Sequence, residues 1–322
     1  MVLSRPLTRR PVTNGLSRAS GLVNRDAADW ADPDVAWEVD AENARAWIDG
    51  VSYSSLTALI ASSNADFTRA LAGYAQTDAG VFTAFASGAL RRTDKGLLIE
   101  VARTNKCTNY NAAPNGSLTN LTKSGDAAGV LSEADDTAAL LAAGLQEICS
   151  SGKVFKLDNS AGATTAIVAV TGTVGNTNPH IFSAYMRATA GSINVGRTAT
   201  STGAASTSSA AYSRCVTAAL SPSGAGEQMR FQVSAGGVGY FILNQLEEAS
   251  SVSTPIAVAG SSVTRPADAL TLFPAAATYD LTFTFDDNST QAVNGSAIDG
   301  SGYAVPTNLT RPYIKRISAV VA

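Results

Sequence analysis

The residues best suited to catalysis or metal binding are one histidine, His180, and three cysteines, Cys107, Cys149 and Cys215. A Ser-His-Asp or Cys-His site would have to use His180, yet no GxSxG elbow or cysteine signature stands beside it. We therefore interpret His180 as a strand-edge or surface residue. Zinc sites need ligands at short spacings, which these widely separated cysteines do not offer. Their odd number and the absence of a CxxC pair predict small buried thiols rather than a disulfide framework.

Adjacent carboxylates are the other group with chemical potential, because a pair can cleave glycosidic bonds. The three pairs are Asp135 with Asp136, Glu247 with Glu248, and Asp286 with Asp287. The first begins an expected helix and the third lies at an expected hairpin turn. Asp286, Asp287 and Asn288 could also bind Ca²⁺, but their spacing fits no established loop. No catalytic residue, metal site or cofactor is expected, and the chain is interpreted as not an enzyme.

Composition limits the partners of this chain. Of its 322 residues 15% are charged, against about 25% in an average globular protein, and the net charge is −3. Such a surface has no broad attraction for nucleic acid or anionic membranes. No apolar run is long enough to span a membrane or to form a secretory signal. Synthesis in a cytoplasm is expected, without membrane insertion or nucleic acid as a partner.

Periodicity favours β-structure beyond residue 150. Apolar residues alternate with polar ones in three segments, residues 180–188, 227–233 and 278–286. Strict alternation is typical of antiparallel strands with one packed face and one wet face. A hairpin turn is expected at Asp287 and Asn288. Together with many Gly, Ser and Asn turns, the pattern predicts an all-β fold, an antiparallel jelly roll or β-sandwich.

Two helical segments interrupt this pattern. Residues 133–147 (EADDTAALLAAGLQE) have high helix propensity, and Asp135 or Asp136 could cap that helix. A shorter helical turn is expected where Leu56, Leu59 and Ile60 share one face.

The first 43 residues differ from the rest. Prolines interrupt them, and arginines precede the first acidic residue, Asp26. Such a stretch buries too little surface to order itself. It predicts an extended attachment arm over residues 1–43, held by a partner protein; an arm folded back on its own domain is the alternative. Docking on an acidic protein groove suits the arginines better than DNA does, and the residues expected to dock are Arg5, Arg9, Arg10 and Arg18.

Three segments, in order, carry a resemblance to a known family. They are residues 67–105, with the core GLLIE followed by ARTN, residues 178–188 (NPHIFSAYMRA), and residues 241–270, with QLE and VTRPAD. This set resembles a module found in tail fibres, spikes and other structural proteins of tailed bacteriophages. The resemblance implies a concanavalin-like jelly roll over residues 44–272, a fold often used to bind carbohydrate. Residues 273–322 resemble a small C-terminal β appendage of such modules.

The residues of this motif are expected to have a structural role, with ligand contact as the alternative. Arginine can form two hydrogen bonds to one carboxylate, so Arg103 and Arg265 are expected to fix chain crossings between sheets. The structural-motif residues are Glu100, Arg103, Asn105, Gln245, Glu247, Arg265 and Asp268.

Two functions follow from the resemblance. In the first, a fibre or spike of the virion docks by its arm to other virion proteins and presents the jelly roll to host-surface glycans. The residues expected to contact glycan are Tyr74, Tyr110, Tyr212, Asn109 and Asn111. In the second, a head decoration or a tail or collar component stabilises the particle and binds no ligand. Both imply location in the virion, synthesis in the bacterial host cytoplasm and a homotrimer.

Overall fold

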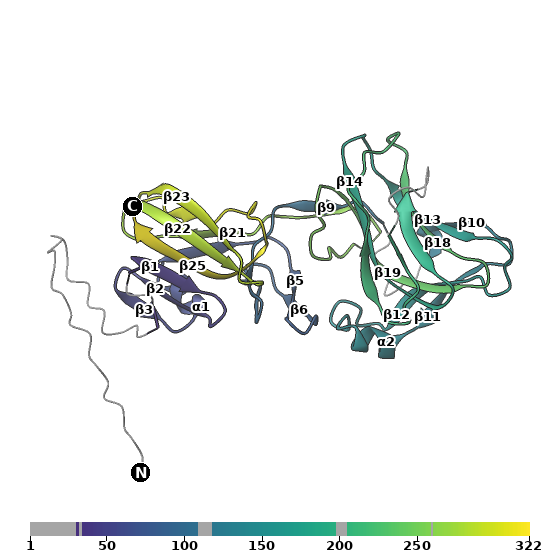
Figure 1. The fold of residues 1–322 in the computed structure, drawn as a ribbon, viewed down its shortest axis with the longest axis horizontal. Helices are drawn as coiled ribbons and strands as arrows, with labels where there is room; N and C mark the ends of the chain where they lie inside the picture. Colours follow the sequence, from purple (N-terminus) through teal and green to yellow (C-terminus); the bar gives the residue numbers. More distant parts are fainter. Residues whose placement is uncertain (1–29, 32–33, 109–117, 198–204, 259) are drawn as a thin grey trace, which may run out of the picture.

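The structure is a computed structural model and describes residues 30–31, 34–108, 118–197, 205–258 and 260–322. In these residues the protein is nearly all β, with antiparallel sheets and two short α-helices. The expected all-β fold class is confirmed. Figure 1 shows two β lobes side by side, connected by extended segments. No helix in the described ranges is long and apolar enough to span a membrane.

One lobe, here called the sandwich lobe, consists of two antiparallel five-stranded sheets. The first sheet has the order β10 (Leu121–Gly125), β13 (Ala166–Thr173), β18 (Gln228–Val233), β15 (Ile193–Arg197) and β16 (Ala205–Thr207). The second has the order β11 (Val130–Asp135), β12 (Lys153–Asp158), β19 (Val238–Glu248), β14 (His180–Ala190) and β17 (Ser213–Val216). A short 3₁₀ turn, η1 (Leu118–Asn120), precedes β10.

The core of the sandwich lobe lies between its two sheets. Phe182 and Met186 of β14 and Phe231 of β18 are fully buried there, as their alternation predicts. The rings of Phe231 and Phe241 stack across the sandwich with centroids 4.0 Å apart. Burying such side chains stabilises a fold by about 1.5–3 kcal/mol each. Aromatic packing between the sheets therefore holds this lobe together.

The second sheet is also covered on its other face, by α2 (Thr137–Ala142) and the loop that follows. The helix expected over residues 133–147 is wrong in its extent. Residues 130–135 form β11 instead, where Glu133 pairs with Phe155 of β12. Gly144, at φ +69°, lies in a turn beyond the helix end. Before α2, strand pairing thus overrides the local helix propensity of residues 133–135. After α2, a glycine in the left-handed conformation follows the end of the helix.

The other lobe is built from both ends of the chain and is called the split lobe. Its main sheet has the order β23 (Thr290–Ile298), β22 (Ala277–Phe285), β25 (Tyr313–Val321), β1 (Trp37–Asp40), β2 (Arg45–Ile48) and β3 (Val51–Tyr53). In addition, β8 (Gly96–Leu98) pairs with β25, and β7 (Arg92–Thr93) pairs with β8. A smaller sheet has the order β24 (Tyr303–Ala304), β21 (Ala269–Leu272) and β4 (Ala65–Thr68). A separate hairpin consists of β5 (Gly73–Gln76) and β6 (Phe82–Phe85).

Local signals in the split lobe match the sequence patterns. Tyr279, Leu281, Phe283 and Phe285 are all buried in its core, as the alternation predicts. The expected hairpin joins β22 and β23, with Asn288 at φ +64°. The expected helical turn is α1 (Leu56–Ala61), where the Ser55 hydroxyl accepts a hydrogen bond from Ala58 N at 3.0 Å.

The start of the described chain belongs to the same sheet as its end. Residues 37–40, assigned above to the attachment arm, form β1 and pair with β25, Val39 facing Ile317. Residues 44–99 share this core with residues 270–319. The core of the split lobe therefore joins segments that the expected domain boundaries, at residues 43 and 272, would separate. In the sequence, the sandwich lobe therefore lies between the two parts of the split lobe.

Candidate functional site

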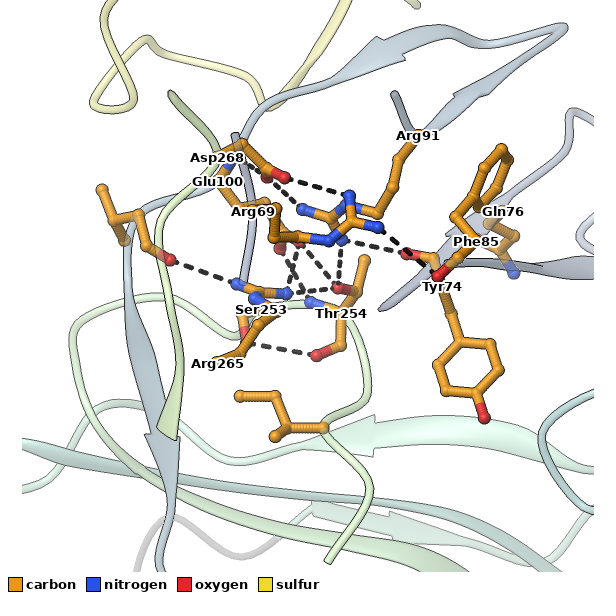
Figure 2. Close-up of polar contacts among 12 residues, drawn as sticks. Arg69, Tyr74, Gln76, Phe85, Arg91, Glu100, Ser253, Thr254, Arg265 and Asp268 are labelled. Atoms are coloured by element: carbon orange, nitrogen blue, oxygen red, sulfur yellow. Dashed lines mark hydrogen bonds and ion pairs between the residues drawn. The ribbon is translucent and has the colours of Figure 1, made fainter. Parts of the chain in front are cut away.

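The chain crosses between the lobes through two segments that pair with each other. β9 (Arg103–Asn105) leads out of the split lobe and β20 (Val263–Arg265) leads back, with Arg103 facing Arg265. Beside this ladder lies a buried set of charged side chains (Figure 2). We call these side chains, together with Thr254, which hydrogen-bonds to Glu100, the ion network: Arg69, Arg91, Glu100, Thr254, Arg265 and Asp268.

Glu100, which follows β8, is bound from three directions. Its Oε2 accepts hydrogen bonds from Arg91 Nη1 at 2.8 Å and Arg265 Nη1 at 2.6 Å. The hydroxyl of Thr254 donates to the same oxygen at 2.6 Å, and Thr254 N donates to Oε1 at 2.8 Å. One carboxylate thus joins the outgoing segment to the returning one.

Asp268, just before β21, is the second carboxylate of the ion network. It accepts hydrogen bonds from Arg91, from Arg69 Nη1 at 3.3 Å and from Glu100 N at 2.9 Å. Arg69 also donates to Ala86 O at 2.6 Å, which fixes the turn after β6. The network therefore connects β4, the turn before β7, and both crossing segments.

The neighbouring charges keep Glu100 ionised. Burial by itself raises the pKa of Glu100, but the charges of Arg265 and Arg91 and the hydrogen bonds from Thr254 outweigh it and lower this pKa to about 2. The ion pairs are among the strong kind, since charged donors meet charged acceptors away from water. A group with so low a pKa holds no proton to donate at neutral pH. The arrangement suits structural fixation rather than proton transfer.

A second polar layer continues from β9 into the sandwich lobe. Asn105 Nδ2 donates to Asn244 O at 3.0 Å and Ile256 O at 3.1 Å, while its Oδ1 accepts from Cys107 N and Leu246 N. All of these groups are buried. The side chain of Asn105 therefore satisfies the hydrogen bonding of four backbone groups where β9 enters the sandwich lobe.

Gln245 and Glu247 hold the loop after β19. Gln245 Nε2 donates to Glu247 Oε2 at 2.7 Å, and Gln245 Oε1 accepts from Ile256 N at 2.9 Å. Ser253 Oγ donates to Glu247 Oε1 at 2.6 Å. Apart from Arg103, the structural-motif residues thus lie in two adjoining buried layers. Arg103 differs from the expectation: it makes no ion pair with a described residue, because Glu100 is bound by Arg265 and Arg91 instead.

Of the residues expected to contact glycan, the structure describes Tyr74 and Tyr212. Tyr212 is 8% exposed, and its hydroxyl donates to Asp136 Oδ2 at 2.7 Å. Asp136 is in turn bound by Arg187 through two 2.7 Å hydrogen bonds. Tyr74 is half-buried against the core beside α2. The rings of Tyr74 and Tyr212 therefore both pack against other parts of the protein. Tyr110, Asn109 and Asn111 lie outside the described residues, as do Arg5, Arg9, Arg10 and Arg18.

His180 is buried, which corrects its interpretation as an edge or surface residue. Its Nδ1 donates to Asn178 O at 2.6 Å, and its Nε2 accepts from Lys106 Nζ at 3.0 Å. Both ring nitrogens are thereby used in holding the start of β14. The side chain is a structural anchor between that strand and Lys106.

The cysteines and the acidic pairs also have structural surroundings. All three cysteines are free and buried, and burial raises the pKa of Cys149 to about 12. Asp286 is bound by Arg311 at 2.7 Å, and Glu248 by Asn178 at 2.6 Å. Among the described residues no group of three or more His, Cys, Asp or Glu side chains is placed to hold a metal ion.

Arg69, Arg91 and Thr254 are functional members of the ion network that the sequence reasoning did not single out. Arg69 lies in a segment that carries the resemblance, and Arg91 precedes the Asp94–Gly96 turn. Thr254 also lies in such a segment, residues 241–270, but outside its QLE and VTRPAD motifs.

No protein-family model matches this chain. A search of curated proteins also finds no match.

Proposed function

We propose that this protein is a non-enzymatic structural component of a tailed-bacteriophage virion, of the fibre or spike type. The split lobe is the base, and the ion network holds the sandwich lobe in a set orientation for contact with host-surface glycans. The N-terminal residues attach the base to other virion proteins, and the working unit is a homotrimer.

One observation supports the proposal best: separate segments that carry the resemblance meet in space. Glu100 lies 165 positions from Arg265 and 168 from Asp268, yet contacts both. Asn105 lies 141 positions from Leu246 and accepts its amide hydrogen. Two similar motifs could occur separately by chance, but their meeting in one buried connection is what a shared structural module requires. This favours reading the resemblance as a module of phage structural proteins.

The burial of Tyr212 and the packing of the half-buried Tyr74 favour a second candidate, an architectural part without a ligand. A head decoration or a tail or collar component needs rigid lobes and attachment only. Copy number separates the two candidates, because decorations occur in large numbers on the head and fibres in a few copies at the tail.

Mass spectrometry and cryo-electron microscopy of purified particles of the phage that carries this sequence test the proposal. The protein should be present at a fixed copy number, with its density on the outside of the particle. Absence from purified particles, with abundant protein in the infected-cell lysate, would overturn it.

The role of the N-terminal residues has its own test. A chain that begins at Trp30 keeps β1, which a deletion of residues 1–43 would destroy. It should remain folded but no longer attach to particles. Light scattering should give three times the chain mass of 32.9 kDa for the full chain. A monomer would refute the homotrimer, and attachment without residues 1–29 would refute the arm.

A further inference from the structure

A cleft of about 370 Å³ opens where the two lobes meet. Its floor is the outgoing segment from Ile99 to Arg103. One wall is the loop after β19, residues 250–253, and the other is the loop before β25, residues 307–310. This volume is in the range of small-ligand sites, about 300–1,000 Å³. Residues from both lobes thus enclose a space large enough for a small molecule.

The cleft is held open by hydrogen bonds beneath it. Ile99 N donates to Pro312 O at 2.9 Å, which ties the floor to the loop before β25. Thr254 N donates to Glu100 Oε1 at 2.8 Å, which ties the floor to the loop after β19. A ligand would therefore meet walls that are already in place, and less ordering would oppose its binding.

Two charged residues line the cleft, Glu100 and Arg103, and the carboxylate of Glu100 is already bound by Arg91 and Arg265. Directly across the ladder from Arg103 stands Arg265, and like charges in that position repel. Glu100 neutralises Arg265 at 2.6 Å, whereas Arg103 makes only one long hydrogen bond, to its neighbour Ala102 O at 3.4 Å. No carboxylate in the described part of the chain lies within ion-pair distance of Arg103. An anion in the cleft would supply the missing counter-charge.

The walls indicate what kind of anion fits. Ser250, Ser251 and Asn308 offer hydroxyl and amide groups, and Val252 and Leu309 offer apolar surface. Hydroxyl and amide groups bind sugar hydroxyls, while apolar side chains pack on the C–H face of a pyranose ring. None of these five side chains is charged. A small phosphate would leave them without a role.

We propose that this cleft binds a carboxylated sugar, with its carboxylate on Arg103 and its ring between the two loops. The inference names the ligand class of the glycan contact proposed above, and it rests on that proposal for the choice of a saccharide. The proposed site is a polar cleft between the lobes and includes none of the residues expected from the sequence to contact glycan.

Titration of the full-length protein with glucuronate and with N-acetylneuraminate, followed by NMR or calorimetry, tests the inference. At least one should bind saturably, and glucose, which lacks the carboxylate, should bind about tenfold more weakly or worse. Arg103→Gln should weaken the binding about tenfold or more, since a charged hydrogen-bond pair is lost. Lys123→Gln, which removes one positive charge from β10 in the sandwich lobe, should bind like the unaltered protein.

Three results would overturn the inference: no saturable binding of either acid, equal binding by Arg103→Gln, or acetate binding as tightly as the sugar acids. Each leaves the virion assignment standing, because presence in purified particles does not depend on the cleft. Absence from particles with intact sugar binding would instead overturn the virion assignment alone.

Discussion

The ion network and the neighbouring cleft use the same residue type in opposite ways. Arg265 is 2% exposed and is bonded to Glu100, so its charge fixes the crossing between the lobes. Arg103 faces it across the ladder, is partly exposed, and has no carboxylate partner among the described residues. Two arginines in similar motif positions therefore differ in their surroundings, because a carboxylate lies within reach of Arg265 but none of the described carboxylates lies within reach of Arg103.

The largest expected effect comes from breaking the buried network. Glu100→Gln leaves Arg91 and Arg265 buried without their shared counter-charge, which should lower the free energy of unfolding by about 3–5 kcal/mol. Urea denaturation at neutral pH measures it. Glu133→Gln is the matched control, because Glu133 is an exposed carboxylate on β11. An equally small loss for both variants would show that the network does not stabilise the fold.

Acid should reproduce part of that loss. The pKa of Glu100 falls from 4.5 to about 2 on folding, so its stabilisation is present above pH 4.5 and is lost as pH falls through 2. The linked change is about 3 kcal/mol. Denaturation of the unaltered protein and of Glu100→Gln across this range separates Glu100 from other acids. Parallel pH profiles would exclude it as the source.

A smaller effect is expected from the polar layer beside the network. Asn105→Ala leaves the amides of Cys107 and Leu246 without their acceptor, which should cost about 2 kcal/mol. Thermal unfolding measures the change, and Asn294→Ala on the exposed strand β23 serves as the control. A variant as stable as that control would mean that other groups or water satisfy these amides.

The smallest effect on stability is expected at Arg103. Its single long hydrogen bond leaves little to lose, so Arg103→Gln should change the free energy of unfolding by less than about 0.5 kcal/mol while reducing sugar binding. Denaturation of this variant measures its free energy of unfolding, and titration of the same preparation measures its sugar binding. A loss as large as that of Glu100→Gln would place Arg103 with the structural residues and remove the contrast.

The sequence was most informative where side-chain alternation decides the structure. Phe182 and Met186, or Phe283 and Phe285, could be assigned to one face because a strand has a period of two, and their burial follows. The ends of the helix expected over residues 133–147 could not be predicted in this way. Glu133 and Asp135 belong to a strand instead, because they pair with residues of β12 that lie further along the chain.

The site was only partly predictable for a related reason. The motif pointed to Glu100, Arg265 and Asp268, but Thr254 joins them through the path of a loop that no local pattern encodes. Tyr212 looked like an exposed loop aromatic, yet Asp136, 76 positions away in the chain, accepts a hydrogen bond from its hydroxyl and holds the ring inside. Contacts between residues far apart in the sequence determine which polar side chains remain available to bind a ligand.

The most direct test of the central claim, that the ion network holds the lobes in one orientation, is a distance measurement between them. Spin labels on cysteines introduced at Asn294 in the split lobe and Ser124 in the sandwich lobe are suitable, because both positions are exposed and the native cysteines are buried. Pulsed electron resonance at neutral pH should give one narrow distance distribution, which broadens in Glu100→Gln while circular dichroism shows that the strands persist. The same narrow distribution in both proteins, or a broad one with the network intact, would contradict the claim.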